Sequence, residues 1–144
     1  MRKKEVGVAV RRVEGAAMGG VPAKRVLVVG DRPEIGAVVG ELLTRYGYEV
    51  QHASHSTAAS LMLTESEEAF PHVAILDTGR YLTSSVSVME FIRGTMRSSL
   101  PVIVLTASAT EEQEADFERL GVNRLLWKPV SARELLSTVA EAAG

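Results

Sequence analysis

The sequence predicts an α/β fold in which helices cover both faces of one parallel β-sheet. Three apolar runs, VLVV (26–29), VAIL (73–76) and VIVL (102–105), lack the alternation of a half-exposed strand. Continuous apolar strands are typical of parallel sheets that are buried on both faces. Helical segments separate these runs, as in α/β proteins. The 144 residues have room for one such domain and not for two independent cores.

Five strand and helix units follow one another from Lys24 onward. The predicted strands are 25–29, 48–53, 73–76, 101–105 and 124–127. The predicted helices are 35–46, 56–68, 86–96, 111–120 and 132–142. The first helix places six apolar residues on one face: Ile35, Val38, Val39, Leu42, Leu43 and Tyr46. For five strands we expect the flavodoxin-like, doubly wound order 2-1-3-4-5, in which ligands bind beyond the carboxyl ends of the strands.

The first 23 residues differ from the rest in composition. They contain five Lys or Arg against two Glu, and four of the twelve glycines, whereas residues 24–144 have a net charge of −5. We interpret residues 1–23 as a flexible basic tail and residues 24–144 as the folded domain. The alternation of Val6, Val8 and Val10 leaves open an additional edge strand.

Composition excludes several classes of protein. Apolar residues make up 46% and charged residues 24%, with a net charge of −2, which argues against disorder and against a nucleic-acid-coating surface. The absence of Cys excludes disulfides and Cys-based zinc sites. No apolar run reaches the ~20 residues that span a bilayer. We therefore expect a cytoplasmic protein with no nucleic-acid or membrane partner.

Polar residues follow four of the five predicted strands. Asp31 follows the first strand, Asp77 the third, Thr106 the fourth and Lys128 the fifth. In the predicted order these strands are neighbours, so the four side chains would converge at one edge of the sheet. The chain has only three Asp, and Lys128 is its only Lys after Lys24, which makes the coincidence informative.

Such a set can transfer a phosphoryl group to a carboxylate. Asp77 would attack the phosphorus in line, while a hard cation held by Asp31 would neutralise the repulsion between anions. Lys128 would hold a phosphoryl oxygen and Thr106 would donate a hydrogen bond to the product. Catalysis would come mainly from positioning and charge compensation.

The same residues carry a family resemblance. The segments KRVLVVGDRPEIG (24–36), HVAILD (72–77), PVIVLTAS (101–108) and GVNRLLWKPVSARELL (121–136) resemble the receiver domain of two-component response regulators, over about residues 24–144. The resemblance implies that Asp77 accepts a phosphoryl group from a histidine kinase or phosphotransfer protein.

The resemblance also implies the remaining site residues. Mg²⁺ would be held by Asp31, by Asp77 and by the backbone carbonyl of Gly79. Thr106 would be the switch hydroxyl, and Lys128 would contact the phosphoryl group from a cis Lys-Pro bond. The protein would then be a signalling phosphoacceptor and not an enzyme, capable at most of Mg²⁺-dependent self-phosphorylation and dephosphorylation.

Three positions depart from the family pattern. Gly30 replaces one residue of the acidic pair, so we expect weak Mg²⁺ binding. The loop from Asp77 to Ser85 lacks the usual Met-Pro turn and is expected to be longer. Leu125 occupies the place of an aromatic residue that turns inward on activation, so coupling through Thr106 is expected to be weak or to take another route.

Each candidate residue also has a purely structural interpretation. Asp31 could cap the helix that begins at Pro33, and Asp77 could be a turn residue. Thr106 could simply end its strand, and Lys128 could be a surface charge. We expect Trp127 to serve packing. The three His show no spacing typical of metal ligands.

The leading hypothesis is a receiver that signals to an unknown output protein through its fourth helix, fifth strand and fifth helix. The alternative is a pseudo-receiver, an interaction module that works without phosphorylation, which Gly30, the altered loop and Leu125 favour. A nucleotide-binding turn at 30–36 is weaker, because it lacks G-x-G-x-x-G. Leu135, Leu136 and Val139 could support a homodimer or equally well the core.

Overall fold

The computed structural model describes residues 8–11, 23–65, 67–79 and 82–144. Six strands form one sheet in the order β1-β3-β2-β4-β5-β6. Their bounds are β1 (Val8–Arg11), β2 (Arg25–Val29), β3 (Glu49–Ala53), β4 (Val73–Asp77), β5 (Val102–Thr106) and β6 (Arg124–Trp127). The strands β3-β2-β4-β5-β6 are parallel, which confirms the predicted order 2-1-3-4-5.

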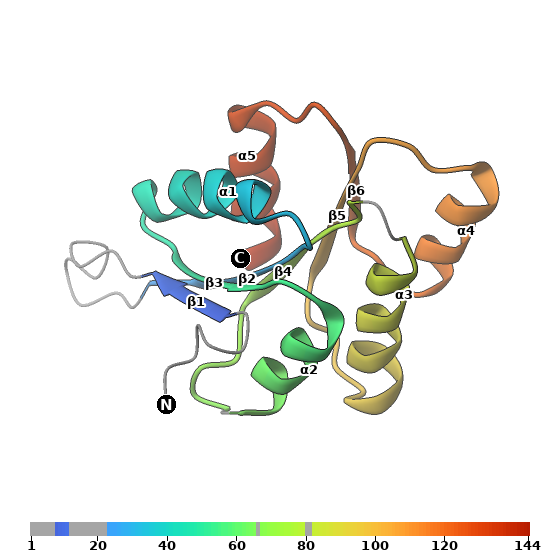
Figure 1. Cartoon of the computed structure of the whole chain (residues 1–144), viewed down its shortest axis with the longest axis horizontal. Coiled ribbons are helices and arrows are strands. Elements are labelled where there is room, and N and C mark those ends of the chain that lie inside the picture. Colours follow the sequence, from blue (N-terminus) through green and yellow to red (C-terminus); the bar gives the residue numbers. More distant parts are fainter. Residues whose placement is uncertain (1–7, 12–22, 66, 80–81) are drawn as a thin grey trace.

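Helices cover both faces of this sheet. Their bounds are α1 (Pro33–Arg45), α2 (Ser56–Glu65), α3 (Leu82–Glu90), the π-helical turn η3 (Phe91–Thr95), α4 (Glu111–Arg119) and α5 (Ala132–Ala143). In Figure 1, α1 and α5 lie above the sheet and α2 and α3 lie below it. Among the described residues, no helix has both the length and the apolar character needed to cross a bilayer.

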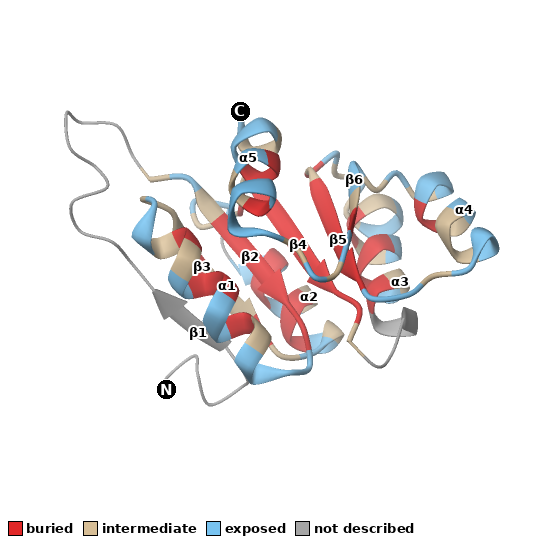
Figure 2. Ribbon diagram, turned by 90° about the horizontal axis from the view of Figure 1, so that it is seen from above, coloured by how far each residue is buried: buried red, intermediate tan, exposed pale blue. Residues whose placement is uncertain are grey.

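The core consists of two layers, one on each face of the sheet. Leu43 of α1 packs in the layer that includes Val28 of β2. Phe117 of α4 packs in the opposite layer, which includes Leu27 of the same strand. Figure 2 shows that the central strands β4 and β5 are buried along their length. Burial from both sides explains why these strands are apolar at every position before their polar last residue.

The structure contradicts part of the predicted tail. Val8–Arg11 forms β1, which pairs antiparallel with β3 so that Val8 lies opposite Ala53. The open alternative, an edge strand, is therefore correct for this segment. The pairing satisfies backbone groups that β3 would otherwise leave free at the edge of the sheet. Residues 1–7 and 12–22 lie outside the described residues, and the domain boundary at Lys24 stays a prediction.

The helix after β4 begins earlier than predicted. Helix α3 starts at Leu82 and is continued by η3, whereas the sequence predicted a helix over 86–96 after a long loop. The connection between β4 and the helix is thus shorter than the sequence predicted, whereas its length relative to the family pattern stays a prediction. Thr83, Ser84 and Ser85 look like loop residues in the sequence, but Ser and Thr are also well accepted at the start of a helix.

Helix α1 buries Val39 and Leu43 as predicted, but it also buries two glycines that the sequence did not predict. Gly36 and Gly40 face the sheet, while Val38 is 67% exposed and Tyr46 is 62% exposed. A Cβ atom on Gly36 would lie 2.5 Å from Nε2 of His52, so only glycine lets the helix approach this side chain. Burial lowers the pKa of His52 from its ordinary value. The prediction was wrong for Val38 and Tyr46, and it missed the glycines because glycine carries no apolar signal.

Candidate phosphoacceptor site

The predicted site residues of β4, β5 and the segment after β6 lie at one edge of the sheet. Asp77 ends β4 and pairs with Leu105, and Thr106 ends β5 and pairs with Trp127. The parallel ladder continues beyond β6, because the backbone N–H of Lys128 donates to the carbonyl of Thr106 at 2.8 Å. The convergence expected from the strand order is therefore present in the structure.

Asp77 and Lys128 form a buried ion pair between Oδ1 and Nζ. The side chain of Asp77 is completely inaccessible and that of Lys128 is 18% exposed. The peptide bond between Lys128 and Pro129 is cis, as expected. The structure thus contradicts the interpretation of Lys128 as a surface charge and of Asp77 as a turn residue. Charges attract more strongly in such a water-poor place than at the surface.

The carboxylate of Asp77 has acceptor capacity to spare. Its Oδ1 is paired with Lys128, whereas its buried Oδ2 has no partner among the described residues. It borders a cavity of about 40 Å³, which Asp31 also lines. A buried carboxylate oxygen without a partner is costly. The arrangement therefore suits a small cation or a polar ligand that enters the cavity.

Asp31, Gly79 and Gly30 surround this carboxylate. A Cβ atom on Gly79 would collide with Oδ1 of Asp31, so this carboxylate lies against the Gly79 backbone. Gly79 has φ +53°, a conformation that glycine adopts without strain. A Cβ atom on Gly30 would lie 3.1 Å from Cβ and 3.3 Å from Oδ2 of Asp77. Gly30 is therefore beside Asp77, at the place where the family resemblance implies a second acidic residue.

Asp31 does not cap the first helix. Arg32 occupies the cap position and makes no side-chain cap bond, and Pro33 is the first helical residue. The side chain of Asp31 thus stays available to the cavity. The interpretation of Asp31 as a helix cap is therefore wrong, because the cap position is one residue further along the chain, at Arg32.

The donor set fits Mg²⁺ only in part. Among the described residues, no three His, Asp or Glu side chains gather closely enough to hold a metal on their own. Two carboxylates and a backbone carbonyl with several waters are nevertheless an ordinary environment for Mg²⁺. The unpartnered Oδ2 of Asp77 would gain a partner. Asp31, Asp77 and Gly79 are the residues that would hold the ion.

The hydroxyl of Thr106 is buried but is not directed at Asp77. Its Oγ1 donates to the carbonyl of Ser108 at 2.8 Å and lies 3.2 Å from Oγ1 of Thr78. The residue is 1% exposed and Thr78 is 6% exposed. Thr106 therefore does more than end its strand, since its side chain bonds to two other segments of the edge.

Four residues of the cavity were missed by the sequence analysis: Ser54, His55, Thr78 and Ser85. Ser54 and His55 follow β3, the one parallel strand that contributed no residue to the predicted site. Nδ1 of His55 also accepts a hydrogen bond from Ala58 N at 3.1 Å. Thr78 could have been found from its position next to Asp77 and one strand away from Thr106.

Two further expectations concern β6. Trp127 is 44% exposed, so the prediction that it serves packing was wrong. Its side chain lies at the end of an outer strand, where no helix covers it completely. Leu125 is partly buried and packs against the core layer beneath α4. It offers an apolar side chain at the position where the family resemblance implies an aromatic one.

Comparisons with known proteins identify the family of the chain. The model of the response regulator receiver domain matches residues 26–140. The transcriptional regulatory protein GltR of Pseudomonas aeruginosa is 32% identical over 117 residues, which cover 81% of this chain and 47% of the relative. The sensory transduction protein RegX3 of Mycobacterium tuberculosis is 32% identical over 114 residues, 79% of this chain and 48% of that protein. The chain spans about half the length of these two relatives.

Solved structures show the same fold. The chemotaxis protein CheY4 of Vibrio cholerae superposes with a TM-score of 0.74 at 24% identity, over 83% of this chain and 98% of that one. A receiver domain protein from Methanospirillum hungatei gives a TM-score of 0.73 at 24% identity, over 84% and 94% of the two chains. The strand order, the polar edge and the sequence match agree. The chain belongs to the response regulator receiver domain family.

Proposed function

We propose that the protein takes up a phosphoryl group on Asp77 from a histidine kinase or phosphotransfer protein and passes the signal on through protein contacts. Response regulators interact with histidine kinases and output domains, and receiver domains are signalling modules rather than classical enzymes. The observation that carries the proposal is the fully buried Asp77 carboxylate, paired with Lys128 and bordering a cavity. We also propose that this takes place in the cytoplasm.

The side chains have distinct tasks in this reaction. A carboxylate oxygen of Asp77 forms the new bond to phosphorus, and the donor leaves with the electron pair of the bond that breaks. Lys128, already beside Oδ1 of Asp77, offsets negative charge as the phosphoryl group arrives. Burial excludes bulk water, so this charge pair acts in a low dielectric.

Receiver domains generally bind Mg²⁺ at the phosphorylation site. Bound here, the ion would supply positive charge near the phosphoryl oxygens. We propose weak binding, since Gly30 offers no carboxylate and only Asp31 and Asp77 supply charge. Gly79 would add its backbone carbonyl.

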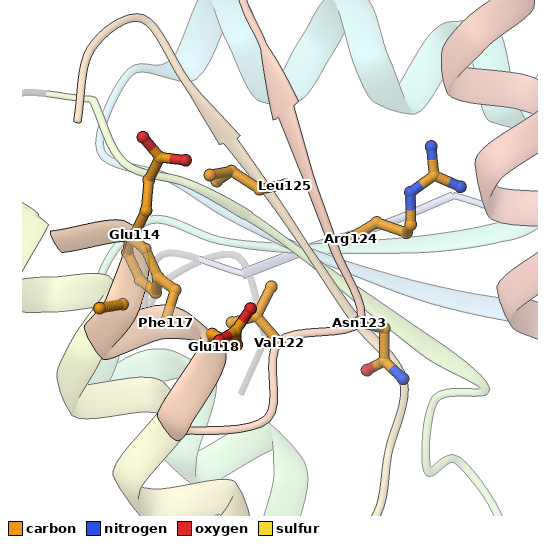
Figure 3. A pocket seen from close by; sticks show the side chains of 8 residues that line it. Glu114, Phe117, Glu118, Val122, Asn123, Arg124 and Leu125 are labelled. Carbon is orange, nitrogen blue, oxygen red and sulfur yellow. The ribbon is translucent and has the colours of Figure 1, made fainter. Parts of the chain in front are cut away.

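We place the output contacts on the face of α4, β6 and α5. A surface hollow of about 410 Å³ opens there between Phe117 of α4 and Leu125 of β6, as Figure 3 shows. Glu114 and Glu118 stand at its rim (Figure 3). Val104, two residues before Thr106, pairs with Leu125 in the sheet, so a change at Thr106 has a short path to this hollow.

A homodimer also stays within the proposal, but not through all of the predicted contacts. Leu135 and Val139 are buried at 5% and 0% exposure in the core layer beneath α1 and α5. Leu136 is partly buried against the same layer. Side chains that already fill the core cannot hold a second copy.

The second candidate function is a phosphorylation-independent interaction module. The specific observation in its favour concerns the Thr106 hydroxyl. It donates to the carbonyl of Ser108 and accepts from Thr78, and it makes neither bond with Asp77. The lack of a carboxylate at Gly30 points the same way. This pseudo-receiver would keep the fold and the α4-β6-α5 face without using the site.

Incubation with acetyl phosphate and Mg²⁺ tests the leading proposal. We expect intact-protein mass spectrometry to find one added phosphoryl group on the wild type and none on Asp77→Asn. Asp116→Asn is the matched control, because Asp116 is the exposed partner of Arg119 on α4 and should change nothing. Equal labelling of both variants would assign the phosphoryl group elsewhere.

A binding experiment separates the two candidates. Trp127 directly precedes Lys128 and is partly exposed, so its fluorescence should change when beryllofluoride, a mimic of the phosphoryl group, binds with Mg²⁺. No response at millimolar Mg²⁺ together with no mass shift would favour the pseudo-receiver.

A further inference from the structure

Two buried threonines at the edge of the sheet are hydrogen-bonded to each other across 28 residues of sequence. Oγ1 of Thr78, which follows Asp77, lies 3.2 Å from Oγ1 of Thr106. Thr78 lines the cavity that Asp77 borders. With 6% and 1% exposure, the two residues are shielded from bulk water. Bulk water therefore competes little for this hydrogen bond.

The direction of this hydrogen bond follows from counting protons. A threonine hydroxyl has one hydrogen to donate and two lone pairs to accept with. The hydrogen of Thr106 is directed to the carbonyl of Ser108, at 2.8 Å. Thr78 must then be the donor to Thr106. In this state the Thr106 hydroxyl has no proton left for a group on Asp77.

The position of Thr78 is itself fixed by the backbone. Its N–H donates to the carbonyl of Leu105 at 3.0 Å, directly before Thr106 on β5. Thr78 and Thr106 thus sit at adjacent strand ends in a defined register. The bond between their side chains does not depend on a mobile surface segment.

We infer that Thr78 is a positioning residue that holds the Thr106 hydroxyl away from Asp77 and so opposes the switch to a phosphoryl-bound state. This inference rests on the proposed function of Asp77 and Thr106. In this inference, Thr106 reaches a phosphoryl oxygen by rotating about χ1 into another staggered rotamer. Both of its present hydrogen bonds are lost in that rotation, and Thr78 supplies one of them.

The first experiment needs no phosphoryl group. Three-bond couplings from the Thr106 methyl carbon to its backbone N and carbonyl C report χ1 in solution by NMR. We expect one dominant rotamer in the wild type and a shift toward a second in Thr78→Val, which keeps the β-branched shape and removes the hydroxyl. Thr78→Ser restores the donor and should return the wild-type couplings.

The second experiment measures beryllofluoride affinity at saturating Mg²⁺. We expect Thr78→Val to bind about fivefold more tightly, the factor that corresponds to one neutral hydrogen bond of ordinary strength. Thr78→Ser should bind like the wild type. Thr138→Val is the matched control for replacing a buried threonine, because Thr138 is 3% exposed on α5 and does not line the cavity.

The outcomes separate this inference from the proposed function. If no variant binds beryllofluoride, the proposed function fails, and the Thr106 couplings alone decide the inference. Unchanged couplings in a folded Thr78→Val protein would overturn it. Weaker beryllofluoride binding by Thr78→Val would overturn it too, since the Thr78 hydroxyl would then assist the ligand. Should Thr78→Val not fold, Thr78→Ala gives the same two measurements.

Discussion

The two ends of the parallel sheet differ in how completely their polar side chains are bonded. At the carboxyl end, the buried Oδ2 of Asp77 has no partner among the described residues. At the amino end, Arg93 of η3 donates to the carbonyls of Ser98 and Gly121 and to Oδ1 of Asn123. Asn123 in turn accepts from Val102 N at 2.7 Å. The carboxylate at one end thus keeps an open acceptor, whereas the guanidinium at the other end donates to three oxygens.

The difference shows where the fold gains stability and where it keeps capacity for a ligand. Paired polar groups at the amino end join the turn before β5 to the turn before β6 and need nothing from outside. At the carboxyl end, the buried Oδ2 of Asp77 has no partner among the described residues, which lowers stability until a cation or phosphoryl group binds there. We therefore expect Mg²⁺ to alter the loss in the free energy of unfolding for variants at the carboxyl end. For variants at the amino end, Mg²⁺ should leave that loss unchanged.

The largest effect is expected from Lys128→Met, which removes one partner of a buried ion pair. Asp77 would keep a buried charge without compensation, and the free energy of unfolding should fall by about 3 kcal/mol without metal. Added Mg²⁺ should restore part of this loss. Urea denaturation with and without Mg²⁺ measures both quantities.

Arg124→Met is the control for this variant. Arg124 pairs with Glu141 at the surface, with side chains 46% and 75% exposed, so its loss should cost less than about 1 kcal/mol. Equal losses for Lys128→Met and Arg124→Met would show that the Asp77 pair is solvated in solution.

The next effect is expected at the amino end, from Arg93→Met. Burial lowers the pKa of Arg93, and its removal leaves the carbonyls of Ser98 and Gly121 without their donor. We expect a loss of about 2 kcal/mol in the free energy of unfolding. The loss should be the same with and without Mg²⁺, which distinguishes the two ends of the sheet.

Arg119→Met provides the comparison for Arg93→Met. Arg119 pairs with Asp116 on the surface of α4, with side chains 71% and 41% exposed, and should contribute only a few tenths of a kcal/mol. If Mg²⁺ restored the free energy of unfolding that Arg93→Met loses, the amino end would also respond to the ion, which contradicts the expected difference between the two ends.

A smaller effect is expected when the missing carboxylate is added. Gly30→Asp should tighten Mg²⁺ binding roughly tenfold, because a third carboxylate joins Asp31 and Asp77. Gly30→Ala is the control, since its methyl group meets Cβ of Asp77 at the same 3.1 Å without adding charge. Isothermal titration with Mg²⁺ measures both. Identical affinities in the two variants would show that position 30 does not face the ion.

The smallest effect is a pH dependence at the amino end. Nδ1 of His72 accepts from Arg25 N at 2.9 Å. Burial, followed by the charges of Arg25 and Lys24, lowers the pKa of His72 below its ordinary 6.5. The unfolded chain then binds the proton more readily, so stability is complete above pH 6.5 and falls as the pH drops below it.

The variant His72→Asn tests this linkage, because the Asn side-chain oxygen can accept from Arg25 N without titrating. Thermal melts between pH 8 and pH 5 should show a Tm loss in the wild type that exceeds the loss in the variant by a few degrees at most. Parallel pH curves for the two proteins would exclude His72 as the titrating group.

Local pattern was sufficient for the strands and for most of the site. VLVV, VAIL and VIVL indicated a buried parallel sheet, and the residues after these strands had to meet at one edge because parallel strands end on the same side. Asp77 and Lys128 could therefore be paired from the sequence alone. Physical reasoning reaches this far because short segments determine where strands end, and because 2-1-3-4-5 is the common order for five parallel strands.

Contacts between distant segments decided the rest. The bond between Thr78 and Thr106 joins residues 28 positions apart, and the fit of Gly36 against His52 exists only once α1 lies on β3. Pairing of Val8–Arg11 with β3 likewise depends on the edge that β3 presents. The sequence determined which chemistry is gathered at the sheet edge, whereas packing decided which hydroxyl donates to which, because hydrogen-bond direction depends on all neighbours at once.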